Sequence, residues 1–435
     1  MKGAIDSATK PFAALSRRWK RAGFNEQLGW LLVAAFILRL FWIAAVPVEP
    51  VSDSVIYATT AENIAVHGVY GISLDKPFSY WPVGTAAIYA GAYNLFGVNA
   101  ASAVFINLIA SMLLVYTTAL LTQRWFDERA GILAASLLAV WPSLIMFTTI
   151  YASEIFFALF VNLALLAWRP DARRWFFLAL LSGAFFAAAA YVRPVALLIP
   201  FIVIGLKAIR SGRIVRPALA GFLVIIATAA VIAPWSARNT ALHGEFVLIS
   251  TNGGPNLWMG NNPDSTGAYM PTPDYVRDLS EIDRAKRLGE DAKQYMRDHP
   301  ARTAALFVRK LVDTHIRETI AVVWNAKGLE RRYGEKSVTI LKVVAQGYWT
   351  VLLLAGLVGV ALILRNAVQA GFNFAAVQFL ANPALLFWGY YAGVHAVIVS
   401  QDRYHFPSIP FIAMLAAFAF IAVRARFESA QMKET

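Results

Sequence analysis

Four groups of ionisable residues lie beside long apolar segments of this chain, where the cost of burying a charge makes each of them a candidate for function. Asp53, Tyr57 and Lys76 follow the first apolar segment, Glu154 begins a later one, and Arg193 lies in a turn between two more. The fourth group comes from two distant stretches and contains Arg238, His243, Asp402, Arg403, Tyr404 and His405. Carboxylates beside several cations suit the transfer of a group from a phosphate. The carboxylate removes the proton of an attacking hydroxyl, and the cations stabilise the departing phosphate.

Structural roles are an alternative for these same residues. Asp53 and Glu154 each stand where a helix begins, and a carboxylate there is favoured by the helix dipole and by free N–H groups. Arg193 is harder to explain in this way, because basic residues concentrate in the inner loops of membrane proteins. Asn261 belongs to an Asn- and Gly-rich stretch whose amides suit sugar hydroxyls, but such a stretch equally forms compact turns.

Composition assigns the chain to a broad class. Of its 435 residues, 58% are apolar and 15% are charged, and the mean hydropathy is +0.55. Apolar runs of about 20 residues recur, which is the length needed to cross a bilayer. The composition therefore predicts an all-α polytopic membrane protein. The net charge of +13 is explained by basic inner loops rather than by nucleic-acid binding, and the absence of cysteine excludes disulfides and thiolate metal sites.

The hydropathy pattern predicts about ten transmembrane helices. They cover residues 28–46, 100–122, 130–147, 153–168, 175–191, 194–209, 217–233, 338–364, 374–399 and 404–423. With the N-terminus inside, the inner loops, such as WRPDARR and KAIRSGRIVR, are basic, and all four groups of candidate residues lie outside. Arg39, inside the first apolar segment, should face the interior of the helix bundle or extend to the membrane surface.

Three parts of the chain follow from this topology. Residues 1–233 form an N-terminal membrane module whose first outer loop, 47–99, carries Asp53; residues 234–337 form an outer segment; residues 338–435 form the last membrane helices and an inner tail. The first loop should contain a helix from Asp53 to Gly68 and a second interfacial helix within 77–97. The outer segment should contain one strand at 246–250 and helices within 273–298 and 301–323.

These stretches together resemble the GT-C glycosyltransferases that use polyprenyl-phosphate sugars. The resemblance is closest to bacterial members akin to protein O-mannosyltransferases and to the lipid A aminoarabinose transferase. It rests on SDSVIYATTAENIA, PFSYWPVGTAAIYAGAYNLFG, YASEIFFALF, YVRPVALL, APWSARN, NGGPNLWMGNN and QDRYHFPSIPF, in this order along nearly the whole chain. It implies that Asp53 is the catalytic base, that Glu154 is a second acid, and that Lys76 and Arg238 contact the lipid phosphate. Many relatives carry an Asp-Glu pair in the first loop, whereas Ser54 follows Asp53 here.

The resulting expectation is an inverting glycosyltransferase of a bacterial inner membrane, with its active site facing the periplasm. Its donor would be a sugar on polyprenyl phosphate, and its acceptor a glycan or lipid such as lipopolysaccharide, or else a protein. Catalytic roles are expected for Asp53 and Glu154, and substrate binding for Tyr57, Lys76, Arg193, Arg238, His243, Asn261, Arg403, Tyr404 and His405. No cofactor is expected, and a divalent metal on Asp53 and Glu154 lacks a supporting histidine motif. A transporter or flippase of lipid-linked saccharides, and a polymerase or ligase with a diphosphate donor, are the alternatives.

Overall fold

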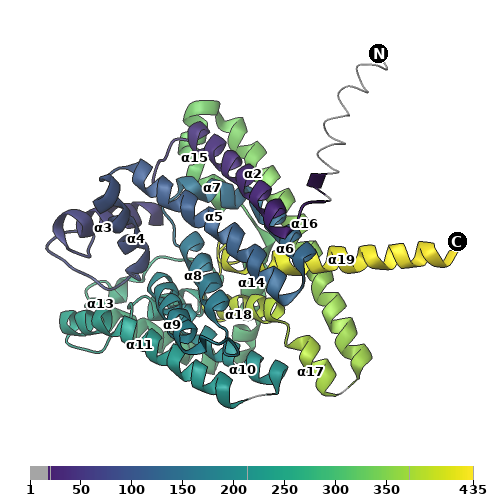
Figure 1. Cartoon of the computed structure of the whole chain (residues 1–435). Coiled ribbons are helices and arrows are strands. Elements are labelled where there is room, and N and C mark those ends of the chain that lie inside the picture. The colour runs from purple at the N-terminus through teal and green to yellow at the C-terminus, as the bar shows by residue number, and fades with distance from the viewer. Residues whose placement is uncertain (1–17, 20, 213, 372, 435) are drawn as a thin grey trace.

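The computed structural model describes residues 18–434 except 20, 213 and 372, and these residues fold as packed helices (Figure 1). No strand occurs among them; the one β-type pairing is an isolated bridge between Ser73 and Lys76. The expected strand at 246–250 is wrong. Its carbonyl groups instead accept hydrogen bonds from a neighbouring helix: Trp235 Nε1 and Asn239 Nδ2 donate to Ile249, at 3.2 and 2.9 Å. The basic N-terminal stretch lies mostly outside the described residues.

Seven helices of the described chain are long and apolar enough to cross a membrane, or eight if one bent pair counts as a single span. The seven are α2 (Phe24–Ala45), α5 (Ala100–Trp125), α9 (Trp175–Val192), η2 with α10 (Pro194–Leu198, Ile199–Ser211), α11 (Val215–His243), α16 (Glu335–Ala370) and η4 with α19 (Phe406–Ser408, Ile409–Glu434). The bent pair is α6 (Glu128–Ala139) followed by α7 (Pro142–Met146) and η1 (Phe147–Thr149), with a bend of 58°. The all-α polytopic class is therefore confirmed.

Two of the ten expected crossings are short helices. α8 (Glu154–Ala167) has 14 residues, and most of its side chains are buried among other helices. The segment 374–399 divides into α17 (Phe374–Leu380) and α18 (Pro383–Val397), because Pro383 begins a new helix. A third helix is longer than expected: α11 continues through Pro234 to His243. All ten expected segments are helical. The described chain has fewer membrane-spanning helices than expected because α8, α17 and α18 are each too short to count as one.

The bend between α6 and α7 leaves carbonyl groups without helical partners, and a buried arginine satisfies them. Arg39 of α2 is fully buried and donates from Nη1 to the carbonyl oxygens of Ala139 and Ala35, both at 3.0 Å. Its Nε donates to Ser111 Oγ at 2.7 Å. The prediction that Arg39 faces the bundle interior is therefore confirmed.

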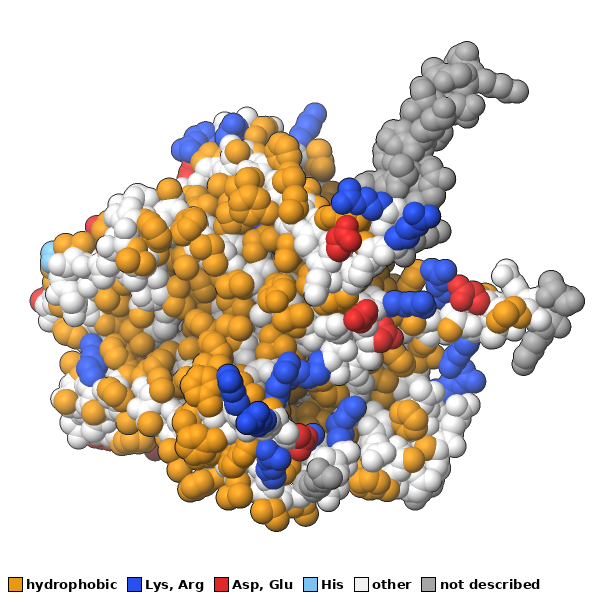
Figure 2. Space-filling view, viewed as in Figure 1, with side chains coloured by type: hydrophobic (Ala, Val, Ile, Leu, Met, Phe, Trp, Pro, Cys, Tyr) orange, Lys and Arg blue, Asp and Glu red, His pale blue; other side chains and the backbone are white. Residues whose placement is uncertain are grey.

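The first loop and the outer segment together contain six α-helices among the described residues. They are α3 (Asp53–His67), α4 (Gly84–Phe96), α12 (Gly253–Gly260), α13 (Glu281–Asp298), α14 (Pro300–Ile316) and α15 (Ile320–Tyr333). In Figure 1, α3, α4 and α13 lie opposite the end from which the C-terminal part of α19 projects. Figure 2 shows a broad apolar surface, with many Lys and Arg side chains toward the α19 side. Helices at both expected places of the first loop, α3 and α4, are confirmed.

Candidate active site

Asp53 is the first residue of α3 and binds Arg403, which precedes the last helix. Arg403 Nη2 donates to Asp53 Oδ2 although the two residues are 350 positions apart, and the Asp53 side chain is 21% exposed. Gly68, in the left-handed conformation, ends α3 as expected. Ser52, at the N-cap position of α3, makes no capping hydrogen bond through its side chain. Ser52 instead is the one non-glycine residue with positive φ in the described chain, a strained conformation directly before the acid.

Glu154 begins α8 and is completely buried between two arginines. Arg193 Nη2 donates to Glu154 Oε1 at 2.5 Å, and Arg403 Nη1 lies 3.6 Å from the same oxygen. Arg193 also donates from Nε and Nη2 to Ser153 Oγ, at 3.0 and 2.9 Å. Asp53, Glu154, Arg193 and Arg403 thus form one continuous cluster, which we call the acid–arginine cluster.

Close backbone packing brings the segments of this cluster together. Gly84 begins α4 against the turn that carries Arg193, where a Cβ on it would lie 2.6 Å from the backbone of Tyr191. Ser54 Oγ of α3 donates to the carbonyl of Tyr151 at 2.9 Å, close to Glu154. Tyr89 of α4 accepts from the Ala152 N–H at 3.0 Å. The starts of α3, α4 and α8 are therefore held to one another around the two acids.

Aromatic rings enclose the arginines of the cluster. The Arg403 guanidinium lies 4.7 Å from the ring centroid of Trp324, on α15, and 5.5 Å from that of Tyr404. The Arg193 guanidinium also lies 5.5 Å from the centroid of the Tyr404 ring. Such cation–π contacts stabilise a guanidinium that has lost part of its water. Tyr404, predicted only as a binding residue, thus contacts and orients both cations.

The electrostatics of the cluster keep Arg403 and the neighbouring Tyr57 protonated. Burial alone would lower the pKa of Arg403, but the carboxylates of Asp53 and Glu154 outweigh burial and raise it, so the guanidinium stays charged. Burial, with the nearby charges of Asp53 and Glu154, raises the pKa of Tyr57. Tyr57 therefore stays protonated and cannot serve as a base at neutral pH. Its ring packs edge-on against Trp81 at 5.5 Å, beside Asp53.

Asp402 and His405 point away from the cluster, toward the break between α14 and α15. Asp402 Oδ2 accepts from Thr319 N and Oγ1, at 3.2 and 2.8 Å, and His405 Nε2 contacts Glu318 Oε2. The His405 ring is 1% exposed and stacks on Trp349 at 4.2 Å. His405 does not face the cluster, which differs from its expected binding role. The contacts of Asp402 and His405 hold the turn on both sides of Arg403 and Tyr404, and so orient these two side chains.

Arg238, His243 and Lys76 lie in other surroundings. Arg238 Nη1 donates to the carbonyl of Phe78 at 2.9 Å, and His243 Nε2 is 3.5 Å from Glu281, a residue that sequence reasoning missed. Glu281 also accepts from Ser79 N at 3.0 Å and from Thr251 Oγ1 at 2.7 Å. These bonds attach the first loop to the outer segment. Lys76 is exposed in the same loop and joins no ion pair within the described residues.

Asn261 is buried and holds a lysine rather than facing the cluster. Lys310 of α14 is 1% exposed, and its Nζ donates to the Val397 carbonyl at 2.8 Å and to Asn261 Oδ1 at 3.1 Å. Its other acceptors are carbonyl oxygens of Gly260 and Ile398, at 3.2 and 3.3 Å. No carboxylate pairs with Lys310 among the residues described, so the lysine fastens the outer segment to the loop before Arg403 through neutral oxygens alone.

The burial of the Lys310 side chain makes the free energy of unfolding depend on pH. It lowers the pKa of Lys310 from 10.5 to about 8. Between these values the unfolded chain binds more protons than the folded one, so stability rises with pH above about 8, by about 1 kcal/mol per unit. Below about pH 8 the contribution of Lys310 to the free energy of unfolding does not change with pH. We expect the difference in melting temperature between the parent chain and Lys310→Met to change steadily from about pH 8 to about pH 10 in detergent, in favour of the parent chain. A constant difference across this range would contradict the burial argument.

Within the described residues, no group of three His, Asp or Glu side chains is arranged to hold a metal ion. Asp53 and Glu154 both face the Arg403 guanidinium, which already supplies the positive charge between them. A metal on this acid pair would have to displace that arginine.

Sequence reasoning missed several residues that support the cluster, namely Ser153, Trp324, Gln401 and Glu318. Ser153 could have been found as the neighbour of Glu154 in YASEIFF. Trp324 and Glu318 carry no comparable signal, because only the fold brings α15 and the preceding break to Arg403.

Comparisons with known proteins confirm the resemblance seen in the sequence. The family model for dolichyl-phosphate-mannose-protein mannosyltransferase matches residues 76–237, a range that includes Glu154 and Arg193. Part of the chain is therefore similar to this glycosyltransferase family. No curated protein matches by sequence.

Two solved oligosaccharyltransferase structures from one archaeon carry the structural comparison. The oligosaccharyltransferase AglB from Archaeoglobus fulgidus, in complex with an inhibitory peptide and a dolichol-phosphate, matches with a TM-score of 0.54 and 14% identity. An Archaeoglobus fulgidus oligosaccharyltransferase in the apo form matches with a TM-score of 0.56 and 14% identity. Each match covers 96% of this chain and 52% of that chain. This chain therefore spans about half the length of AglB. ArnT from Cupriavidus metallidurans, bound to undecaprenyl phosphate, matches with a TM-score of 0.44 and 16% identity over 91% of this chain and 78% of that one.

Proposed function

We propose that this protein is an inverting glycosyltransferase that moves a sugar from a polyprenyl-phosphate carrier to a glycan or lipid acceptor. The observation that carries the proposal is the acid–arginine cluster, in which two carboxylates and two arginines from four distant segments meet around Arg403. The matched family and AglB, whose title names a dolichol-phosphate ligand, support a lipid-linked donor. The basic inner loops support a periplasmic site in a bacterial inner membrane.

The role of Asp53 in the transfer reaction follows from the exposure of its side chain. Asp53 is the partly exposed acid, so it can reach an acceptor hydroxyl and remove its proton. The oxygen of that hydroxyl forms a bond to the anomeric carbon while the bond from that carbon to the phosphate oxygen breaks. Polyprenyl phosphate leaves, and Arg403 and Arg193 stabilise its charge. A single displacement of this kind inverts the anomeric configuration.

Glu154 acts through the arginines rather than on the substrate. Its side chain has no exposure, and Oε1 already accepts from Arg193 while Arg403 lies near it. Burying both arginines without a carboxylate would be costly. We therefore assign Glu154 as a positioning residue that keeps the two cations aimed at the phosphate site.

The test is to incubate the purified protein with sugar-loaded polyprenyl phosphate and an extract of cell-envelope glycans. Polyprenyl phosphate should be released only when acceptor is present, with the sugar recovered on the acceptor in the opposite anomeric configuration. Movement of the intact lipid-linked sugar across vesicles without release would identify a flippase instead. Release of polyprenyl diphosphate from a diphosphate donor would identify a polymerase or ligase.

A further inference from the structure

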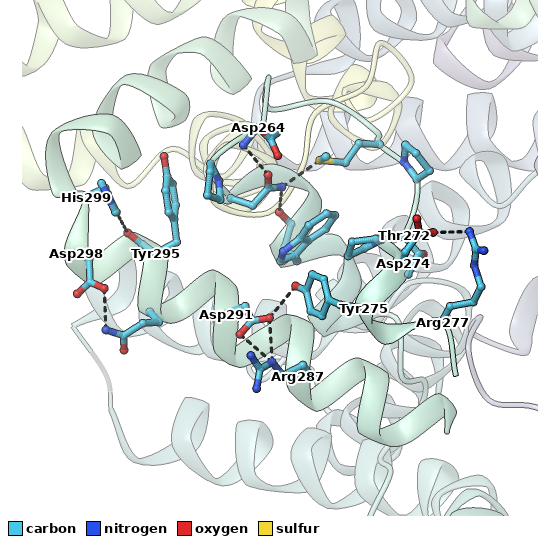
Figure 3. A pocket seen from close by; sticks show the side chains of 17 residues that line it. Asp264, Thr272, Asp274, Tyr275, Arg277, Arg287, Asp291, Tyr295, Asp298 and His299 are labelled. Carbon is cyan, nitrogen blue, oxygen red and sulfur yellow. Dashed lines mark hydrogen bonds and ion pairs between the residues drawn. The ribbon is translucent and has the colours of Figure 1, made fainter. Parts of the chain in front are cut away.

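The outer segment contains a pocket of about 940 Å³ that is separate from the acid–arginine cluster. Three pieces of chain line it: the end of α12 with residues 262–264, the loop 270–277, and the second half of α13 (Figure 3). Beneath it, Trp258, Val276, Leu288 and Ala292 form a small apolar core of their own. The pocket therefore has a packed floor and lies within the size range of ligand sites.

The polar lining of the pocket offers a ligand more hydrogen-bond acceptors than donors. Two arginines are neutralised locally, Arg277 by Asp274 and Arg287 by Asp291, the latter at 3.1 Å. Asp264 and Asp298, also in the lining, have no cationic partner among the residues described. A carboxylate only accepts hydrogen bonds, so this lining suits a ligand rich in donors, such as sugar hydroxyls or amines.

Aromatic rings form the rest of the lining, as Figure 3 shows for Tyr275, Tyr295 and His299. Tyr295 and His299 stack on each other at 4.5 Å. Tyr275 donates from its hydroxyl to Asp291 Oδ2 at 2.8 Å. Burial, with this bond to Asp291, raises the pKa of Tyr275 to about 12, so the hydroxyl keeps its proton. Flat rings beside carboxylates offer a sugar an apolar face and hydrogen-bond acceptors together.

The loop between two pocket residues is hydrogen-bonded to the segment that precedes Arg403. The Gly267 carbonyl, between the pocket residues Asp264 and Met270, accepts from Ser400 N at 2.8 Å and from Ser400 Oγ at 3.0 Å. Ser400 shortly precedes Arg403.

From this lining and its position we infer that the pocket binds a non-anionic part of the acceptor saccharide, away from the sugar that is modified. The identity of the saccharide as acceptor rests on the proposed function. A phosphorylated or uronic stretch is disfavoured, because Asp264 and Asp298 would repel it. An acceptor peptide is the competing occupant, and the experiment must distinguish it.

The experiment measures calorimetric binding of three hexasaccharides to the detergent-solubilised full chain: neutral mannohexaose, the cationic glucosamine hexamer and the anionic galacturonate hexamer. We expect the first two to bind and the third not to bind. The double variant Tyr295→Ala/Asp298→Asn should weaken binding about tenfold. Asp278→Asn, an exposed acid of the same segment outside the pocket, should leave binding unchanged. Asp298 ends α13, where an uncharged side chain is tolerated at least as well, so the variant should fold.

Preferential binding of the galacturonate hexamer would overturn the inference, as would equal binding in the double variant or no sugar binding up to about 10 mM. Tighter binding of an acceptor-type peptide that depends on Tyr295 would overturn it in favour of the peptide. In transfer assays the double variant should raise the acceptor KM about tenfold and leave the donor KM unchanged. The Asp53→Asn variant should still bind the sugars. If the parent chain binds the sugars but transfers none, the proposed function is refuted and the saccharide pocket remains supported.

Discussion

Replacing Asp53 by Asn should abolish most transfer while leaving the protein folded. The amide keeps the size of the side chain but cannot take a proton from the acceptor hydroxyl, and general-base catalysis is worth roughly 10²–10⁴-fold. The loss should fall on kcat. The donor KM should stay the same or decrease, because the neutral amide no longer forms an ion pair with Arg403 and the guanidinium is freer to hold phosphate.

The matched control for this substitution is Asp75→Asn, an exposed acid in the same outer loop. It should transfer sugar at the parent rate. Rates are measured as polyprenyl phosphate released per unit time at saturating donor and acceptor. Activity of Asp53→Asn within about twofold of the parent chain would remove Asp53 from the role of base.

The second large effect is expected for Arg403→Lys. Arg403 uses each of its three nitrogens: Nη2 on Asp53, Nη1 beside Glu154 and Nε on Gln401, the last at 2.8 Å. A lysine keeps the positive charge but not this fork, so kcat/KM should fall roughly 10²–10³-fold. Binding of polyprenyl phosphate alone should weaken about tenfold or more.

Arg309→Lys is the control for this change, since Arg309 is exposed and makes only a surface pair with Asp313 at 3.5 Å. Arg309→Lys should leave both kcat/KM and the affinity for polyprenyl phosphate unchanged. Lysine is preferable to alanine at position 403, because alanine would leave the buried Glu154 with fewer cations and destabilise the fold. Normal affinity of Arg403→Lys for polyprenyl phosphate would contradict a phosphate-binding role.

The sequence predicted the helical segments and the helix that begins at Asp53, because apolar length and a C-terminal glycine such as Gly68 are local signals. It could not predict that α8 has only 14 residues or that 374–399 breaks into two helices. These lengths depend on burial among neighbouring helices. The expected strand at 246–250 had the right residue types but no partner strand, and helix α11 supplies its hydrogen bonds instead.

The topology placed Asp53, Glu154, Arg193 and Arg403 on one side, but it could not show that they touch. Nor could it separate neighbours in the sequence QDRYH. In a turn, consecutive side chains point in different directions. Here Arg403 contacts the acids and Tyr404 packs against its guanidinium, while Asp402 and His405 contact the α14–α15 break. Glu154 illustrates the same limit: its position suggested a second catalytic acid, and its complete burial supports a positioning role instead.

The 350-residue separation between Asp53 and its arginine has a consequence for biosynthesis. At ordinary translation speeds the ribosome needs roughly 20–70 s to travel from the first of these codons to the second. During that interval the growing chain has its acid already inserted but lacks the cation that completes the cluster. If the proposed function holds, a nascent or C-terminally truncated chain that lacks Arg403 should therefore be inert toward the lipid carrier, and activity should appear only after the last helix has been made.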